Sequence, residues 1–416
     1  MIAEILATGD EIRSGALVDS NSAYIAGRLE ESGIEVVRHN CVGDDLDRLS
    51  AVFLEIGSRA DLCVVTGGLG PTEDDLTTEA AANAAGVPLF LDETALAMIE
   101  RFFKARNRVM SESNRKQAMI PQGAARLDNP IGTAPGFAIR IDRCMFFCLP
   151  GVPPEMKRML QEQVLPRLGS LPGAEPGASR IVTISTYGYP ESVAGERVAG
   201  FSKRFPSLKL GLRAKFPEIQ IKIYARGKDP VQLDEKVAQA RQWLLSRVGE
   251  KTFSTEGETM QEVVGRRLKE SGATLAVAES CTGGLISHWL TNVAGSSAYF
   301  LLSAVTYANQ AKQEVLGVSR QTLKSRGAVD EQTAEEMAEG IRRLSGADFA
   351  ISTTGIAGPE GGTPEKPVGT VCIGLSSEHS TFARRYFFPF GQRLMNKKIF
   401  AMTALNLLRR ELEKQK

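Results

Sequence analysis

A short stretch in the last third of the chain carries the residue types that nucleophilic chemistry requires. Residues 276–284 read Ala-Val-Ala-Glu-Ser-Cys-Thr-Gly-Gly. An apolar run ends at Glu279 and Ser280, and a helical pattern of apolar residues follows the two glycines. The stretch predicts a buried strand, a tight turn and a helix start. Ser280 would lie near the strand's carboxyl end, where α/β sheets bind ligands and a helix N-terminus attracts negative charge. The alternative is that Ser280 or Thr282 only caps the helix.

A glycine-rich loop in the first third of the chain could hold a phosphate group. The apolar residues 62–66 predict a buried strand, which runs directly into Gly-Gly-Leu-Gly-Pro-Thr-Glu-Asp-Asp at 67–75. Glycines let backbone amides approach a phosphate closely, and a helix predicted over 72–85 would add its dipole. Asp74 and Asp75 would repel the phosphate unless a metal ion lay between them, or unless they bound ribose hydroxyls. The alternative is that both acidic residues only stabilise the first turn of that helix.

Three further loops accompany this one. They cover residues 8–12, 129–136 and 149–153, and they include Glu11 and Gly132. Most of them follow predicted strands, so they can converge with the glycine-rich loop at one edge of a sheet.

The elements that must position these loops form three groups along the chain. Over residues 1–168, short apolar runs alternate with helical patterns, which predicts a parallel sheet with helices on both faces. Residues 171–178 hold two Pro and two Gly and are typical of a linker. Residues 180–250 read β-α-β-β-α, a small α+β domain. Strand and helix patterns alternate again from residue 256 to the end.

Composition excludes several classes of protein. The 416 residues suffice for about three domains. Lys plus Arg is 50 and Asp plus Glu is 49, so the charge balance argues against nucleic acid or a membrane surface as the main partner. No signal peptide or membrane-length apolar run is found in the sequence. The six Cys are scattered and only three His are present, so we see no zinc site and expect reduced thiols in a cytoplasmic protein.

The four loops of the first group resemble the molybdopterin-binding fold, and more closely the N-terminal domain of the CinA family (competence/damage-inducible protein A). The resemblance implies a molybdopterin-binding-like α/β sandwich over 1–170 that binds ADP-ribose. It also implies a metal-dependent ADP-ribose pyrophosphatase, in which water attacks a diphosphate held by loop amides and a divalent cation of unknown identity. Asp75 falls on the position of the family's aspartate. The residues expected to bind ADP-ribose are Gly67, Gly68, Gly70, Asp75, Glu11 and Gly132, with Asp74 and Asp75 as metal ligands.

The last part of the chain resembles the CinA C-terminal domain, the nicotinamide mononucleotide (NMN) deamidase family. The resemblance rests on the stretch around Ser280 and on later segments, which are residues 306–312, 353–359, 361–370 and 391–393 with Lys397. It implies an α/β deamidase domain over 256–416 that converts NMN and water to nicotinate mononucleotide and ammonia, without a cofactor.

Amide hydrolysis requires a nucleophile, a base and an oxyanion site, and the residue types offer a Ser–Lys arrangement. Ser280 would attack the carboxamide carbon, and Lys312 would take its proton if burial lowered the lysine pKa. Tyr307 could relay or hold that proton. Backbone amides at 282–284, or near Thr354 and the glycine after it, could hold the oxyanion.

Other readings of these residues remain open. A Ser-His-Asp triad has little support, because His288, the single His between residues 256 and 376, lies in the helix after Ser280. Tyr307 could be only a strand-end residue, and Lys312 only a solvated helix lysine.

The substrate's 5′-phosphate requires cations or amides, which Arg393, Lys397 and the loop 355–362 could supply. Two positions depart from the family pattern: Gln310 stands where Glu is common, and Lys397 where Arg is common. Lys397 keeps the charge but loses the bidentate fork for phosphate. The residues expected to bind the substrate are Thr282, Gly283, Gly284, Asn309, Gly355, Gly358, Gly362, Arg393 and Lys397.

The same resemblance makes residues 178–252 a KH-like domain. A nucleic-acid-binding KH domain uses a GXXG loop, which we do not find in this segment, so a structural or dimer-forming role is expected. The family resemblance implies a homodimer. Two rival functions remain: a non-catalytic scaffold associated with competence and DNA damage, and a molybdopterin-binding protein.

Overall fold

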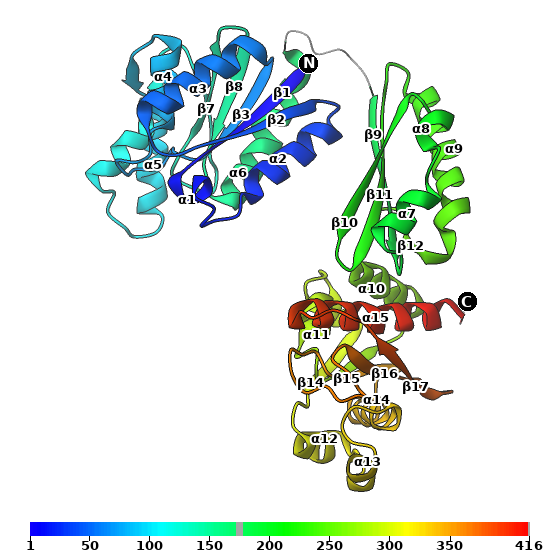
Figure 1. Ribbon diagram of the computed structural model, residues 1–416. Helices are drawn as coiled ribbons and strands as arrows, with labels where there is room; N and C mark the ends of the chain where they lie inside the picture. The colour runs from blue at the N-terminus through cyan, green and yellow to red at the C-terminus, as the bar shows by residue number, and fades with distance from the viewer. Residues whose placement is uncertain (172–177, 415–416) are drawn as a thin grey trace. The chain divides into compact units, whose positions relative to one another are not determined.

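The computed structural model describes residues 1–171 and 178–414 (Figure 1). The linker predicted at 171–178 lies, apart from its first and last residues, outside these ranges. The chain divides into two compact units: residues 1–180 with 225–235, and residues 181–224 with 236–416. In the described ranges we find no helix with the length and apolar character that a membrane span requires.

The first domain is built on a six-stranded sheet with the order β2-β1-β3-β8-β7-β6. The first four of these strands are parallel, whereas β7 and β6 are antiparallel additions. The sequence predicted a parallel sheet only. The short turn at Asp142 folds β7 back onto β8 as a hairpin, and a hairpin forces the antiparallel direction. The strands are β1 (Ile2–Thr8), β2 (Glu35–Val42), β3 (Leu62–Thr66), β6 (Ala125–Leu127), β7 (Gly136–Ile141) and β8 (Cys144–Leu149).

Helices cover both faces of this sheet, as the sequence predicted. Successive residues of β1 face opposite sides: Ile5 packs on the cluster formed with α2 (Ser20–Glu31) and α6 (Pro153–Met159), and Leu6 packs on the cluster formed with the helices across the sheet. Those opposite helices are α3 (Leu46–Arg59) and α4 (Thr77–Ala85). The remaining elements are α1 (Asp10–Arg13), β4 (Leu89–Leu91), α5 (Glu93–Lys104), η1 (Glu112–Ala118), β5 (Met119–Pro121), η2 (Leu160–Val164) and η3 (Leu165–Ser170).

The middle segment follows the predicted β-α-β-β-α order and adds one short strand. Its sheet has the order β10-β11-β9-β12. The predicted first helix is split in two, because Gly200 adopts the left-handed conformation (φ 87°) between the halves. Phe201 and Phe205 pack around Trp243. The KH-like assignment stays a prediction. The elements are β9 (Ala178–Tyr187), α7 (Glu191–Arg197), α8 (Phe201–Arg204), β10 (Leu208–Lys215), β11 (Glu218–Gly227), α9 (Pro230–Val248), η4 (Gly249–Lys251) and β12 (Thr252–Ser254).

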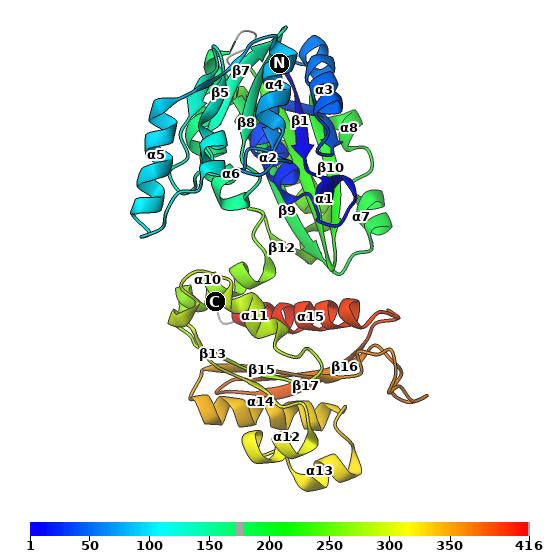
Figure 2. The same ribbon diagram turned by 90° about the vertical axis from the view of Figure 1, so that its left-hand side faces the viewer.

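The last domain has a five-stranded sheet between two layers of helices. The strand order is β14-β13-β15-β16-β17, with the first three strands parallel and the last two antiparallel. Helices α10, α11 and α15 cover one face, and α12, α13 and α14 cover the other (Figure 2). The strands are β13 (Leu275–Glu279), β14 (Phe300–Val305), β15 (Phe349–Gly355), β16 (Thr370–Ser376) and β17 (Thr381–Phe387). The helices are α10 (Met260–Ser271), α11 (Leu285–Thr291), η5 (Ser296–Ala298), α12 (Asn309–Leu316), α13 (Arg320–Ser325), α14 (Glu331–Ser345) and α15 (Arg393–Lys414).

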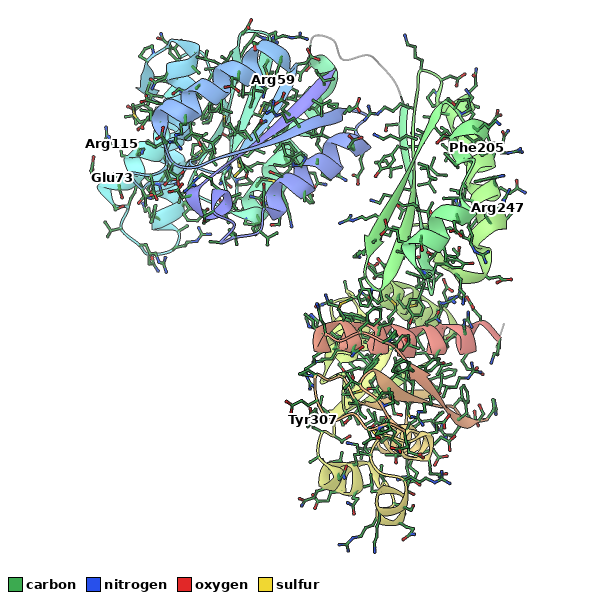
Figure 3. The ribbon with its side chains drawn as sticks, in the orientation of Figure 1. Arg59, Glu73, Arg115, Phe205, Arg247 and Tyr307 are labelled. Carbon is green, nitrogen blue, oxygen red and sulfur yellow. The ribbon has the colours of Figure 1, made fainter. Side chains whose placement is uncertain are left out.

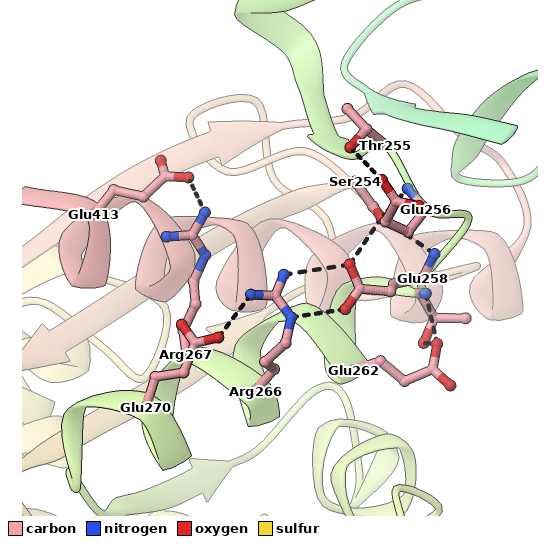
Figure 4. A network of polar contacts seen from close by, with 10 residues as sticks. Ser254, Thr255, Glu256, Glu258, Glu262, Arg266, Arg267, Glu270 and Glu413 are labelled. Carbon is pink, nitrogen blue, oxygen red and sulfur yellow. Dashed lines mark hydrogen bonds and ion pairs between the residues drawn. The ribbon is translucent and has the colours of Figure 1, made fainter. Parts of the chain in front are cut away.

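A polar network fixes the entry from β12 into α10 (Figure 4). Glu258 accepts hydrogen bonds from Ser254 Oγ (2.9 Å) and Arg266 Nε (2.8 Å). Thr259 and Glu262 then form a capping box, so α10 begins at a defined residue. Because α10 and α15 contribute to the same hydrophobic cluster, this entry also helps to fix the helix layer on that face of the sheet.

Candidate functional site

Ser280 lies in a rigid turn directly after β13. Its backbone amide donates to Thr353 O (3.0 Å), and its carbonyl accepts from the amide of Gly283 (3.1 Å). Gly283 and Gly284 follow with φ angles of 60° and 86°, in the left-handed region where a Cβ would be strained. The side chain of Ser280 is only 8% exposed. The backbone therefore presents Ser280 in one orientation at the strand's carboxyl end, as the sequence predicted.

Helix α11 is capped by Glu279, and not by Ser280 or Thr282. The Glu279 carboxylate is fully buried and accepts hydrogen bonds from Ile286 N (3.2 Å), Ser287 N (2.9 Å) and Ser287 Oγ (2.6 Å). The capping alternative for Ser280 is therefore wrong. The negative charge expected at this helix N-terminus is supplied by the protein itself, so these amides are not open to a substrate anion.

Lys312 meets Ser280 in the interior of the domain. Its Nζ lies 3.1 Å from Ser280 Oγ, 2.8 Å from Thr306 O and 3.1 Å from Tyr307 O. The side chain is 1% exposed, so the solvated-lysine alternative is wrong. Burial lowers the pKa of Lys312 from its ordinary value of 10.5, because desolvation disfavours the ammonium. A lysine in this state can act as a base.

A cavity of about 180 Å³ surrounds this pair. It brings together the four predicted catalytic side chains with Gly355 and Arg393, and its lining residues are Ser280, Cys281, Tyr307, Lys312, Ala328, Val329, Thr354, Gly355, Ala357 and Arg393. The Thr354 hydroxyl donates a hydrogen bond to Ala328 O (2.6 Å), which fixes these two lining residues relative to each other.

Tyr307 and Arg393 form the outer part of this cavity. Tyr307 is 62% exposed and lies at the surface of the last domain (Figure 3). Arg393 Nη2 donates to its hydroxyl (3.1 Å), and Arg393 Nη1 donates to Gly358 O (2.7 Å). The Tyr307 carbonyl, rather than its hydroxyl, contacts Lys312. Among the described residues we find no hydrogen bond from the Tyr307 hydroxyl to Ser280 or Lys312, so the structure does not support a proton relay through this hydroxyl.

The remaining predicted substrate-binding residues lie outside the cavity lining. Thr282 is buried and shares a hydrogen bond with Thr353 Oγ1 (2.8 Å). The Lys397 ammonium lies beside the turn, because a Cβ built at Gly283 would stand 3.3 Å from Lys397 Nζ. Asn309 begins α12. Gly284 ends the turn, Gly358 is held through its carbonyl by Arg393, and Gly362 is exposed.

A second cavity, of about 450 Å³, lies where the four loops of the first domain meet. The predicted residues Gly67, Gly68, Gly70, Glu11, Asp74 and Asp75 all line it. Gly132 does not line the cavity, whereas Glu155 does. Gly132 packs directly against Glu155, because a Cβ at Gly132 would collide with the Glu155 carboxylate. At Gly67 (φ 108°), a Cβ would stand 2.5 Å from Thr8 O. Glycine is required because the two loops approach each other so closely.

Asp75 braces the glycine-rich loop. Its Oδ2 accepts from the amide (2.9 Å) and hydroxyl (2.5 Å) of Thr72. This turn delays the helix, so α4 begins at Thr77 instead of residue 72 as predicted. Asp75 therefore does not cap α4, which has Leu76 at its N-cap without a side-chain bond.

The carboxylates around this cavity are concentrated but do not form a closed metal cage. Within 1–171 and 178–414 we find no group of three His, Cys, Asp or Glu placed to hold a metal ion. The described lining of the cavity nevertheless contains six acidic side chains and no Lys or Arg. The acidic residues are Glu11, Asp19, Asp44, Asp74, Asp75 and Glu155. Burial raises the pKa of Asp44, and the neighbouring carboxylates raise it further. Such a donor set fits a hard cation completed by waters and ligand oxygens, as is usual for Mg²⁺.

Two structural roles were missed in the sequence. Asn396 is fully buried, and its Nδ2 donates to Ala357 O (3.0 Å) and Phe390 O (2.8 Å), so it holds the loop after β15 against α15. No local pattern marks it. Glu279 could have been found, because a charged residue that ends an apolar run must find buried donors.

Comparison with known proteins gives two family matches. Residues 257–412 match the CinA C-terminal domain, and residues 4–170 match a family described as "Probable molybdopterin binding domain". The first domain thus has the molybdopterin-binding-like α/β fold that the sequence predicted.

Full-length relatives are also found. A CinA-like protein of Desulfosudis oleivorans is 52% identical over 412 residues, which is 99% of this chain and 100% of that protein. A CinA-like protein of Desulforapulum autotrophicum is 45% identical over 98% of each chain. Among solved structures, the competence/damage inducible protein CihA from Agrobacterium tumefaciens is 40% identical. The match covers 38% of this chain and 97% of that one, with a TM-score of 0.36.

Proposed function

The chain belongs to the CinA family, and from that premise we propose that its last domain is an amidase that hydrolyses nicotinamide mononucleotide to nicotinate mononucleotide and ammonia. The observation that carries the proposal is the buried contact of 3.1 Å between Ser280 Oγ and Lys312 Nζ. A lysine is rarely buried without a function, and this one touches a serine hydroxyl at a strand end.

The surroundings of Lys312 favour a neutral amine as the working form. A neutral amine has two hydrogens, and two backbone carbonyls, Thr306 O and Tyr307 O, accept them. Its lone pair is then left for the Ser280 hydroxyl, which is the third neighbour. The same three contacts would therefore orient the base toward the nucleophile's proton.

The reaction follows from this arrangement. Lys312 takes the Ser280 proton while Oγ attacks the carboxamide carbon. The tetrahedral intermediate collapses when the ammonium gives its proton to the leaving nitrogen, and ammonia departs. Water then attacks the acyl ester with Lys312 again as base, which releases the carboxylate and restores Ser280. The amides of Ser280 and Gly283 are already bonded, so Cys281 and Thr282 supply the better oxyanion donors.

The small cavity fits only the carboxamide end of the substrate. The nucleotide must then extend past Tyr307 and Arg393, which form the exposed part of the lining. A guanidinium has five N–H donors, and two of its nitrogens are already anchored to Gly358 O and Tyr307 OH. The anchored Arg393 would present its remaining donors to the 5′-phosphate.

A second candidate activity belongs to the first domain, which we propose hydrolyses the diphosphate of ADP-ribose. The glycine-rich loop offers backbone amides, and the carboxylates around the cavity require a cation before a diphosphate can enter. Asp74, with the free oxygen of Asp75, would hold that cation. When bound, a divalent cation would neutralise the diphosphate and activate water. We further expect a cytoplasmic homodimer whose partners are these small nucleotides.

The test of the amidase is ammonia release from NMN by the wild type and by Ser280→Ala. Loss of the nucleophile should abolish turnover, whereas the exposed serine variant Ser297→Ala should retain it. Turnover by Ser280→Ala would disprove the nucleophile, and a wild type without activity would support the scaffold alternative. Binding of molybdopterin with no hydrolysis of ADP-ribose would favour the remaining rival for the first domain.

A further inference from the structure

A third cavity, of about 800 Å³, is separate from both candidate active sites and shares no lining residue with either. It lies within the second compact unit. We name it the aromatic cavity; its lining includes Tyr187, Tyr189, Phe216, Tyr386, Phe388 and Phe390. Its volume is within the range of small-molecule sites, about 300–1,000 Å³.

Regular structure builds two of its walls. Alternate residues along β17 and just beyond face it, which are Arg384, Tyr386 and Phe388, because side chains of a strand alternate between its faces. One face of α15 forms the second wall, and its residues Thr403, Leu407 and Arg410 are spaced three to four positions apart, as on one side of a helix. The labels β17 and α15 in Figure 1 locate both elements.

The other walls are turns of the middle segment. The end of β9, the loop that follows it and the start of α7 contribute residues 187–191, and the turn between β10 and β11 contributes Phe216 and Pro217. The Phe216 and Phe390 rings meet edge to face at 5.1 Å, which holds the two sides of the cavity together. Tyr187 donates or accepts a hydrogen bond with Thr403 Oγ1 at 2.6 Å.

The charges at the aromatic cavity are unbalanced. It is lined by three cations, Lys251, Arg384 and Arg410, and none forms an ion pair with a carboxylate among the residues that the structure describes. Of its two carboxylates, Glu218 is already paired with Lys215 (3.2 Å). Glu191 remains as the counter-charge. Unpaired arginines beside aromatic rings match a planar aromatic ligand that carries an anion.

From these observations we propose that the aromatic cavity binds a nucleoside monophosphate, with the base between the aromatic side chains and the phosphate at Arg384 and Arg410. The proposal is independent of the amidase, because it concerns a different set of residues. A purely apolar occupant, such as a second copy of the chain, would leave the three cations without a partner, which is costly in a closed interface.

The experiment measures AMP binding to the full-length chain by calorimetry, with adenosine as the phosphate-free comparison. The Tyr386→Ala and Arg384→Glu/Arg410→Glu variants should each lose one AMP site or bind AMP about tenfold more weakly. Phe387→Ala is the matched control, because Phe387 is 55% exposed on the opposite face of β17 and should bind AMP normally. Asp75→Ala should also keep this site, which separates it from the first-domain cavity. An unchanged far-ultraviolet circular dichroism spectrum and an unchanged denaturation midpoint show that the variants are folded, and this check does not depend on the proposed amidase activity.

Three outcomes would overturn the proposal. The first is AMP binding that Asp75→Ala abolishes and Tyr386→Ala leaves unchanged. The second is equal affinity for AMP and adenosine, which would remove the anion from the argument. The third is a change of oligomeric state in Tyr386→Ala, measured by light scattering, without any change in AMP binding; that result would assign the cavity to a second copy of the chain.

Discussion

The two candidate active sites differ in how many of the groups required for their proposed reactions the protein itself supplies. Around Ser280 the protein itself supplies the proposed reacting groups: the proposed nucleophile and base touch in the interior, and Lys312 Nζ also contacts two backbone carbonyls. The first-domain cavity is larger and is lined by carboxylates that repel the very diphosphate it is proposed to bind. A covalent mechanism requires groups prepared in advance, whereas a phosphate site can be completed by the ligand and its cation. The comparison predicts that the two sites fail under different treatments.

The largest expected effect is the loss of the base. Lys312→Met should lower kcat for ammonia release about 10³-fold, because among the described residues we find no other side chain in hydrogen-bond contact with the Ser280 hydroxyl. Hydrolysis of ADP-ribose by the same variant should be unchanged. Lys324→Met replaces an exposed lysine of α13 and is the matched control. If Lys312→Met releases ammonia at the wild-type rate, the Ser–Lys mechanism is wrong.

Removal of divalent cations should produce the converse pattern. A chelator should lower AMP production from ADP-ribose by about 100-fold or more, and added Mg²⁺ should restore it. Ammonia release should be unaffected, because Lys312 and the backbone amides supply the chemistry of that site. Full AMP production without metal would contradict the cation-assisted mechanism that we propose for the first-domain cavity.

The pH dependence of the two reactions should also differ. Burial lowers the pKa of Lys312, and the neutral amine is the form that we propose as the base. Ammonia release should therefore rise about tenfold per pH unit below that pKa and level off above it, at a pH below the ordinary lysine value of 10.5. A rate that is flat from pH 5 to 9, or that follows ADP-ribose hydrolysis, would exclude Lys312 as the titrating base.

The difference between the sites also explains what the sequence could predict. Strand β3 has the predicted bounds, because it is a continuous apolar run that ends at the glycine-rich loop. The glycine-rich loop was recognisable from composition. The late start of α4 was not, since it depends on the bond from Thr72 to Asp75. The predicted parallel direction was wrong for β6 and β7, because periodicity carries no information on strand direction.

The Ser280 site shows a similar limit. Local patterns placed Ser280 at a strand end and Lys312 in a helix, but their contact depends on the pairing of β13 with β14, which brings segments 32 residues apart together. Asn396 was not predictable, because its partner Ala357 lies 39 residues away and nothing near Asn396 marks a buried amide. The Ser–Lys arrangement was proposed from the residue types that amide hydrolysis requires, and not from any local pattern that shows the two residues in contact.

A smaller effect is expected at the rim of the Ser280 cavity. Tyr307→Phe removes the hydroxyl that Arg393 contacts but keeps the carbonyl that Lys312 contacts. KM for NMN should rise about threefold to tenfold, which is the loss of one hydrogen bond to a charged group, while kcat stays nearly constant. Arg393→Ala should raise KM further. A large fall in kcat for Tyr307→Phe would instead assign the hydroxyl a proton-transfer role.

The smallest expected effect concerns stability. Because the folded state lowers the pKa of Lys312, the unfolded chain binds more protons between the folded and unfolded pKa values, and this lysine's contribution to stability rises with pH across that window. The free energy of unfolding of the wild type minus that of Lys312→Met should therefore increase from pH 7 to pH 10, by about 1.4 kcal/mol for each unit by which the pKa is lowered. Denaturant titrations at both pH values measure the difference, and Lys324→Met should show no such trend. A constant difference would mean that Lys312 stays protonated in the fold, in which case the kinetic pH profile must have another origin.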